Sequence, residues 1–335
     1  MPCASCFPTS VATHGLCGTG AEAAPIMRNL VGVDVRRFNG LMFLGVPCIL
    51  EPSARTAPDE PRSSMQLSAR YVAALDIARS AGQLARNFFA QRETLVVEHK
   101  GTQDFVSRAD RVVEDLIRSH LAAAFPGDAF LGEETAAAFA SELDRVWVVD
   151  PIDGTHNFLR GVRYYCVSIA YVENDQREIG VVYDPENDEL FHARRGHGAW
   201  CERKSGDLRL QASPCDDLAK AFVCVGHNDR APDPRVLALR HALMDAGVAT
   251  RNMGAGALQL AHVAAGRFDG FIELSLNAWD AMAGLLLIEE AGGYAAPFPG
   301  PAGMRVPAPV LGCAKGIAEP IAKLVGAWER RRSPG

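Results

Sequence analysis

The chain has 335 residues, a formal net charge of −6 at pH 7 and 48% hydrophobic residues. This length allows a large core in one or two domains. The acidic balance provides no basic field for nucleic acid, and no apolar run approaches the roughly 18 residues that a membrane span needs. The nine cysteines are odd in number and scattered, which favours reduced thiols. We therefore expect a cytoplasmic protein without a membrane or nucleic-acid partner.

Residues 1–62 differ in composition from the rest of the chain, with scattered Pro, Gly, Ser and Arg and no sustained periodicity. Cys3 and Cys6 form a CxxC pair, but no second pair completes a zinc site. We expect this segment to be a disordered extension, or to lie upstream of the true start near Met65. Apolar residues at three- and four-residue intervals then predict an amphipathic helix from Met65 to Gln91.

Short apolar strands that lead into acidic residues recur along the chain. Residues 129–131 lead to Glu133, and the β-branched run 146–149 leads to Asp150. Since Pro151 has no N–H to donate, we expect that second strand to end at Asp150. Asp153 follows directly, in a turn dipeptide with glycine. The sequence thus predicts two carboxylates at the end of one core strand.

The spacing of Asp150 and Asp153 indicates a cation site. Carboxylates held this close raise one another's pKa unless a cation lies between them, and hard oxygen ligands suit Mg²⁺ or Mn²⁺. The backbone N–H groups of Gly154 and Thr155, at a predicted helix start, would suit a phosphate. The alternative is a strand end with solvated acids and an ordinary turn.

The C-terminal half contains two further acids in structured surroundings. A strand is expected to end at Glu273, and Asp280 lies in the first turn of an apolar helix that ends at Gly292. Such an aspartate could also be only a helix cap. A polar, glycine-bearing stretch near residue 196 suggests a boundary, so we expect an N-terminal α+β subdomain over 65–195 and a C-terminal α/β subdomain over 196–330.

The acidic motifs GEE, DPIDGT and WDxxAG occur in this order, after DFVSRAD at 104–110. Together they resemble the motifs of the inositol monophosphatase family, the lithium-sensitive, magnesium-dependent phosphatases. The resemblance covers about residues 66–330. It implies an α/β (layered α+β) fold, the αβαβα sandwich of the inositol monophosphatase and fructose-1,6-bisphosphatase type, and a homodimer.

The resemblance also implies a role for each motif residue. The implied metal ligands, for two or three Mg²⁺ with Mn²⁺ as a substitute, are Glu133, Asp150, the Ile152 carbonyl, Asp153 and Asp280. Glu133 and Thr155 would orient the attacking water, with Asp110 holding Thr155. Gly154 and Thr155 would bind phosphate oxygens. The residues facing the alcohol half of the substrate would be Ala255, Gly256 and Glu273. Lys100 aligns with a family lysine near the third metal.

The sequence departs from the family pattern at two positions. His156 occupies a position where the family commonly has a second threonine. Its imidazole could be a packing residue, or it could tune the pKa of the attacking water. Ala255 lacks a hydroxyl group that is often present, which weakens the case for myo-inositol specificity. The implied substrate is a small phosphorylated metabolite, either inositol 1-phosphate or a related sugar or polyol phosphate.

Two alternative functions stay open at this point. Relatives with the same metal motifs hydrolyse histidinol phosphate, fructose 1,6-bisphosphate or adenosine bisphosphate. Some bacterial relatives act with the transcription machinery, so the chain could be a transcription-associated binding protein with incidental phosphatase activity. The acidic balance argues against direct contact with RNA.

Overall fold

The structure, a computed structural model, describes residues 62–94, 97–101, 104–136, 144–227, 233–300 and 303–330. These residues belong to one compact unit, Asp59–Gly335. The expected disordered extension, residues 1–62, lies outside the described residues except for Arg62, where helix α1 (Arg62–Ala90) begins. Among the described residues, no helix is both long and apolar enough to cross a membrane.

A seven-stranded sheet forms one half of this unit, with strand order β3-β4-β5-β6-β7-β8-β9. The strands are β3 (Ala129–Gly132), β4 (Arg145–Asp153), β5 (Cys166–Glu173), β6 (Gln176–Asp184), β7 (Glu189–Arg194), β8 (Ala199–Glu202) and β9 (Leu208–Arg209). Only β3 and β4 run parallel, and every other neighbouring pair is antiparallel.

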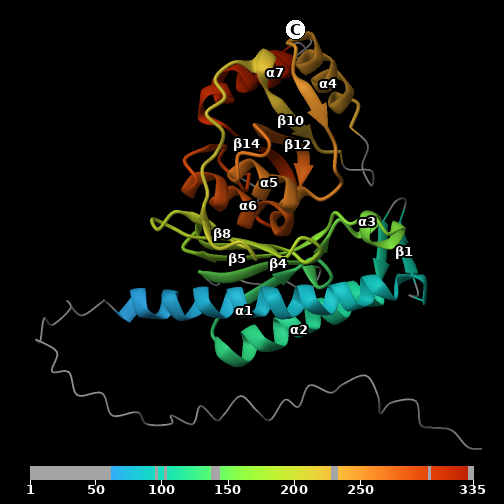
Figure 1. Cartoon of the computed structure of the whole chain (residues 1–335), viewed down its shortest axis with the longest axis vertical. Helices are drawn as coiled ribbons and strands as arrows, with labels where there is room; N and C mark the ends of the chain where they lie inside the picture. Colours follow the sequence, from blue (N-terminus) through green and yellow to red (C-terminus); the bar gives the residue numbers. More distant parts are fainter. Residues whose placement is uncertain are drawn as a thin grey trace, which may run out of the picture. The chain divides into compact units, whose positions relative to one another are not determined.

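Helices cover both faces of this sheet (Figure 1). On one face lie α1 and α2 (Arg108–Ala124). On the other face lie α5 (Gly256–Ala264) and α6 (Ala278–Glu290), of which α6 makes the more extensive contact with the sheet. Alternate residues of strand β4 face these two helical layers. Trp147 and Val149 belong to the core formed with α1 and α2, whereas Val146 and Val148 belong to the core formed with α5 and α6. A strand buried on both faces needs this continuous apolar run.

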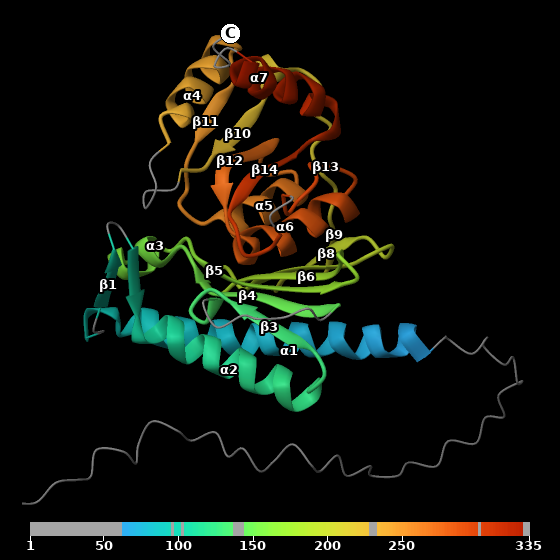
Figure 2. The same cartoon turned by 180° about the vertical axis from the view of Figure 1, so that it is seen from behind.

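A second, five-stranded sheet packs on the far side of α5 and α6, with strand order β11-β10-β12-β14-β13 (Figure 2). Its strands are β10 (Phe222–Val225), β11 (Ala249–Arg251), β12 (Gly270–Leu276), β13 (Tyr294–Ala295) and β14 (Ala308–Cys313). Helices α4 (Arg235–Asp245) and α7 (Ala318–Arg330) form the outermost layer. The expected αβαβα sandwich is therefore confirmed.

Short elements complete the unit. Within the described residues they include an antiparallel pair of strands, β1 (Val97–Gly101) and β2 (Asp104–Ser107), and the six-residue helix α3 (Thr155–Arg160) after β4. They also include the 3₁₀ turns η1 (Arg92–Thr94), η3 (Leu218–Lys220) and η4 (Lys315–Ile317). The beginning of α3 lies against the end of β4, which is where the predicted site residues cluster.

Two predicted strand ends were wrong. Strand β4 continues past Asp150 to Asp153, because its register with β5 breaks there and Pro151 falls where no ladder hydrogen bond is required. Glu273 lies in the middle of β12, paired with Val310, and not at a strand end. Strands β8 and β9 follow residue 196 and still extend the first sheet; the subdomain division at that residue stays a prediction.

Candidate active site

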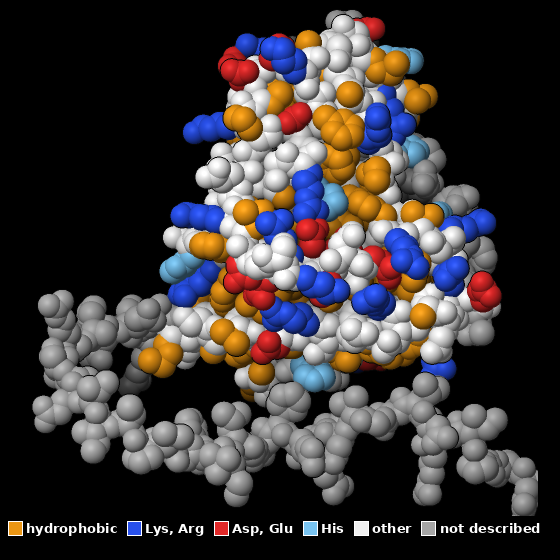
Figure 3. Space-filling model, in the orientation of Figure 1, with side chains coloured by type: hydrophobic (Ala, Val, Ile, Leu, Met, Phe, Trp, Pro, Cys, Tyr) orange, Lys and Arg blue, Asp and Glu red, His pale blue; other side chains and the backbone are white. Residues whose placement is uncertain are grey.

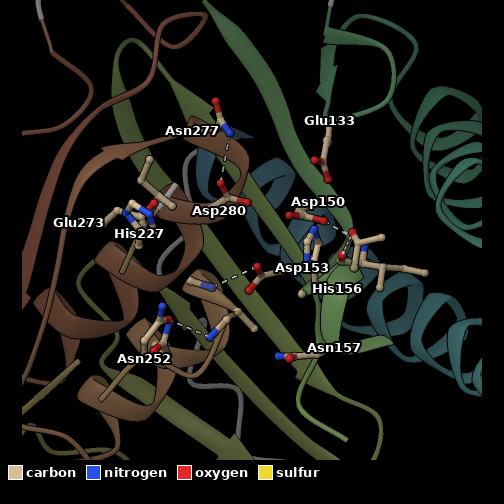
Figure 4. A pocket seen from close by; sticks show the side chains of 18 of the residues that line it. Glu133, Asp150, Asp153, His156, Asn157, His227, Asn252, Glu273, Asn277 and Asp280 are labelled. Carbon is tan, nitrogen blue, oxygen red and sulfur yellow. Dashed lines mark hydrogen bonds between the residues drawn. The ribbon is translucent and has the colours of Figure 1, made fainter. Parts of the chain in front are cut away.

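A pocket of about 360 Å³ opens where the two sheets meet the helices between them. Its walls come from the turn after β3, the end of β4, the first turn of α3, the segment before α5, the strand β12 and the start of α6. Figure 4 shows acidic side chains from several of these elements facing the same space. Segments separated by more than 100 residues of sequence thus form one site.

Three of the predicted metal ligands meet at the floor of this pocket. One carboxylate oxygen from each of Asp150, Asp153 and Asp280 lies within 4.8 Å of the other two. Asp150 and Asp153 come from the irregular end of β4, and Asp280 from the first turn of α6. Glu133, from the turn after β3, lines the same pocket, and Figure 4 shows its carboxylate on the side of Asp150.

Burial and mutual repulsion dominate the electrostatics of these acids. Burial raises the pKa of Asp150 well above its usual range, and the charges of Glu133, Asp280 and Asp153 raise it further. Burial and Asp280 raise the pKa of Asp153 to about 7. None of the described residues that line the pocket is Lys or Arg. Hard oxygen donors without a protein cation fit Mg²⁺ or Mn²⁺. The side chain of Lys100, the lysine predicted to lie near the third metal, is outside the described part of the structure.

Backbone N–H groups at the start of α5 bind Asp153. Its carboxylate accepts hydrogen bonds from Gly256 (3.1 Å), Ala257 (2.8 Å) and Leu258 (3.3 Å). The N-cap residue, Ala255, has no side chain that could accept them. A carboxylate at a helix N-terminus is stabilised by the positive end of the helix dipole. Asp153 therefore joins strand β4 of the first sheet to helix α5, in addition to facing the pocket.

A second network fixes the turn that follows β4. The carboxylate of Asp150 accepts the Ile152 N–H at 2.9 Å. The Thr155 hydroxyl lies 3.2 Å from the Ile152 carbonyl and 3.3 Å from the buried carboxylate of Asp110, so its proton can go to either acceptor. Gly154 has φ +93°, and an added Cβ would lie 3.0 Å from the Tyr164 carbonyl. Only glycine adopts this conformation readily in so tight a space.

The residues predicted to face the alcohol half of the substrate, Ala255, Gly256 and Glu273, also line the pocket. Their predicted contacts stay predictions, as do the ligand and water-orienting roles of the other residues. The structure adds polar neighbours that sequence reasoning missed, namely Asn157, His227, Asn252, Gln259, Ser275 and Asn277. They lie on separate helices, strands and loops, so only the fold brings them together.

Hydrogen bonds hold the segment before α5 in place. The Asn157 amide donates to the carbonyls of Tyr164 and Met253, both at 2.8 Å. The Gln259 side chain accepts the Met253 N–H at 2.9 Å. The segment that carries Ala255 is thus tied to both α3 and α5, and the pocket wall is preformed.

The layered fold and the buried acidic pocket are those of a phosphoric monoester hydrolase. Comparison with known proteins identifies the family within this class, since the sequence profile of the inositol monophosphatase family matches residues 66–325. The chain belongs to the inositol monophosphatase family. Members of this family act on small phosphate substrates and are generally metal-dependent, and magnesium dependence and lithium sensitivity are typical of them.

Individual relatives agree with this assignment. The inositol-1-monophosphatase of Mesorhizobium japonicum is 41% identical over 225 residues, which are 67% of this chain and 83% of that protein. The Nus factor SuhB of Pasteurella multocida is 37% identical over 68% of this chain and 84% of its own length. The crystal structure of the extragenic suppressor protein suhB from Bartonella henselae superposes with a TM-score of 0.67 at 32% identity, covering 80% of this chain and 99% of that one.

Proposed function

We propose that this phosphatase hydrolyses inositol 1-phosphate, or a related sugar or polyol monophosphate, with Mg²⁺. The observation that carries the proposal is the convergence of Asp150, Asp153 and Asp280 within 4.8 Å, without Lys or Arg among the described lining residues. Buried like charges of this kind are stable as ions only when a cation joins them.

The proposed ligands for two or three Mg²⁺, or Mn²⁺ as a substitute, are Glu133, Asp150, the Ile152 carbonyl, Asp153 and Asp280. When bound, such ions lower the pKa of a water molecule and neutralise charge on the leaving oxygen. The side chains supply the geometry. Because the Thr155 hydroxyl can donate its hydrogen bond to Asp110 or to the Ile152 carbonyl, its lone pairs are free to accept a hydrogen bond from the attacking water. Glu133 would be the second hydrogen-bond acceptor and the general base that takes the proton of the water.

The substrate phosphate is proposed to bind at the start of α3, through the N–H groups of Gly154 and Thr155. The alcohol half would then face Ala255, Gly256 and Glu273. The surrounding amides, which include Asn252 and Gln259, offer donors and acceptors that suit several hydroxyl groups. A pocket of about 360 Å³ lies at the small end of the usual range for metabolites.

The charge of the pocket favours a monophosphate over a bisphosphate. A second phosphate group would need a cationic partner away from the metal ligands, and the described lining residues include neither Lys nor Arg. This disfavours fructose 1,6-bisphosphate and adenosine bisphosphate. Histidinol phosphate remains an alternative, since its ammonium group could pair with Glu273.

A phosphate-release assay over this panel, with and without Mg²⁺, tests the proposal. We expect inositol 1-phosphate or another polyol monophosphate to give the highest kcat/KM, and the activity to disappear with EDTA and return with Mg²⁺. A preference above tenfold for histidinol phosphate would overturn the substrate. EDTA-resistant turnover would overturn the metal dependence.

A second candidate function follows from the relatives named Nus factor SuhB, namely association with the transcription machinery. Figure 3 shows basic and acidic side chains interspersed over one face of the molecule. Several of the arginines pair with acids; Arg267, for example, contacts Glu189. Direct RNA binding through this face is therefore disfavoured, and retention of RNA by the purified protein at physiological salt would revive it. The homodimer and the cytoplasmic location stay predictions.

A further inference from the structure

We propose that Glu114, a buried residue of α2 outside the sequence motifs, is a positioning residue that holds Glu133 in the metal pocket. This inference rests on the proposed metal-dependent function. It is distinct from the role of Asp110, because it concerns the turn after β3 and not Thr155.

The contacts of Glu114 are directed at that turn. Its side chain is buried, with 2% of the residue exposed. One carboxylate oxygen accepts the backbone N–H of Glu134 at 2.8 Å, and the Thr135 hydroxyl also hydrogen-bonds to the carboxylate. Gly132 makes the approach possible, since a Cβ at that position would lie 2.4 Å from the carboxylate oxygen.

These contacts fix Glu133 from both sides. The N–H of Glu133 itself donates to the carbonyl of Val149 at 3.1 Å, and Val149 directly precedes Asp150. With its own N–H held by β4 and the next N–H held by Glu114, the backbone of Glu133 has little freedom. Its side chain is therefore directed into the pocket beside Asp150 (Figure 4).

Helix α2 also reaches the site a second time. Asp110 lies one helical turn before Glu114, on the same face of the helix, and its carboxylate lies 3.3 Å from the Thr155 hydroxyl. One rigid helix thus supports both groups that are proposed to orient the attacking water. Sites supported in this way are sensitive to small displacements, because a shift of about 1 Å can lower the rate by about 100-fold.

The experiment separates the hydrogen bond from packing and from charge. Glu114→Met keeps the volume but removes the acceptor, and Glu114→Gln keeps an acceptor for the Glu134 N–H without the charge. The matched control is Asp184→Ala, since Asp184 is also a buried acid (1% exposed) that accepts backbone N–H groups, from Glu186 and Asn187, but lies outside the pocket. Each variant is assayed by calorimetric titration with MgCl₂ alone, by kcat and by melting temperature.

We expect Glu114→Met to weaken Mg²⁺ binding and to lower kcat, each by about 10- to 100-fold, as is typical when the support of a metal ligand is lost. Glu114→Gln should stay within about threefold of the wild type in both quantities, and Asp184→Ala should lower the melting temperature without changing the Mg²⁺ affinity. Wild-type Mg²⁺ affinity in Glu114→Met, or an equal loss in Asp184→Ala, would overturn the inference. A wild-type protein that binds no Mg²⁺ would instead remove the proposed function, and this inference with it.

Discussion

Strand β4 contributes to two regions of this molecule in which carboxylate side chains are buried. Near its beginning, Trp147 donates to Asp128 at 3.1 Å, and the Arg70 guanidinium donates two hydrogen bonds of 2.8 Å to the same carboxylate. At its end, Asp150 and Asp153 face Asp280, with no Lys or Arg among the described residues of the pocket.

The difference separates a structural acid from a functional one. The Asp128 side chain is only 1% exposed, but its charge is neutralised within the fold by a bidentate ion pair with Arg70. The pocket acids have backbone donors and one another, so their charge is left for an external cation to balance. Burial alone therefore does not identify the site, whereas several acids that meet without a protein cation among the described lining residues do.

The largest effect is expected from Asp150→Asn, which removes a ligand charge without changing the packing. Turnover should fall by at least about 1000-fold, equivalent to about 4 kcal/mol of transition-state stabilisation. The free energy of unfolding without metal should stay the same or rise, because one of the repelling charges is gone. Steady-state kinetics and urea denaturation in EDTA measure the two quantities, and wild-type rates in the variant would refute the ligand assignment.

Asp128→Asn should show the reverse behaviour. It leaves the Arg70 charge buried, with 9% of that side chain exposed, so the free energy of unfolding should fall by about 3–5 kcal/mol. The kcat per folded molecule should not change, because neither residue lines the active-site pocket. As a control, the double variant Arg70→Met with Asp128→Leu should recover most of the stability. A specific loss of kcat in Asp128→Asn would break the distinction between the two regions.

His262 adds a third case to the comparison, a buried ionisable side chain that the fold keeps uncharged. It is enclosed by Tyr164, Phe191 and Phe268, and Arg267 lies 3.1 Å from its Nε2. Burial, reinforced by Arg267, lowers the pKa of His262 to about 4. The folded protein therefore binds fewer protons than the unfolded chain between about pH 4 and 6.5, and stability is lost as the pH falls through this range.

The expected size of this acid effect is about 3 kcal/mol between pH 7 and pH 4, at about 1.4 kcal/mol for each pKa unit. Glu189, which pairs with Arg267 and raises the pKa of His262, opposes the effect. His262→Gln carries no titrating group in this range, so its unfolding free energy should fall by that much less on acidification. Urea denaturation at pH 7, 5.5 and 4 tests this, and parallel pH profiles for the two proteins would contradict it.

Added Mg²⁺ should stabilise the folded protein only through the acidic pocket, where no protein cation among the described lining residues balances the carboxylates. At an Mg²⁺ concentration 100 times the dissociation constant, the free energy of unfolding should rise by about 2.7 kcal/mol. Asp150→Asn should lose most of this gain, because it removes a proposed ligand. Denaturation with MgCl₂ or EDTA measures the difference, and an equal gain in Asp150→Asn would place the bound ion elsewhere.

Local patterns in the sequence predicted much of this arrangement. The apolar run before Asp150, the turn at Gly154 and the helix that begins near Asp280 are all encoded within a few neighbouring residues, and the structure has them in the expected places. That the acids share one pocket was not encoded locally. It followed from the resemblance, because the order of three motifs is specific to a family with a known fold.

Long-range contacts account for what the sequence did not predict. The hydrogen bonds from the start of α5 to Asp153 join residues more than 100 positions apart. The hydrogen bond from Glu134 to Glu114 spans 20 positions and two elements. No periodicity or motif in the sequence indicates that either of these two sets of residues lies in contact. A weaker indication existed at α5, since a helix that begins after Ala255 has no capping side chain of its own and needs an acceptor from elsewhere.

The smallest effect is expected at His156, the departure from the family pattern that lies beside Thr155 in the pocket wall. The acceptors near the Thr155 hydroxyl are Asp110 and the Ile152 carbonyl, so the orientation of the attacking water should not depend on the imidazole. His156→Thr should therefore change kcat/KM by less than about threefold, below about 1 kcal/mol. The pH–rate profile decides between packing and chemistry: a limb of the wild-type profile that vanishes in the variant would assign the imidazole to the environment of the water.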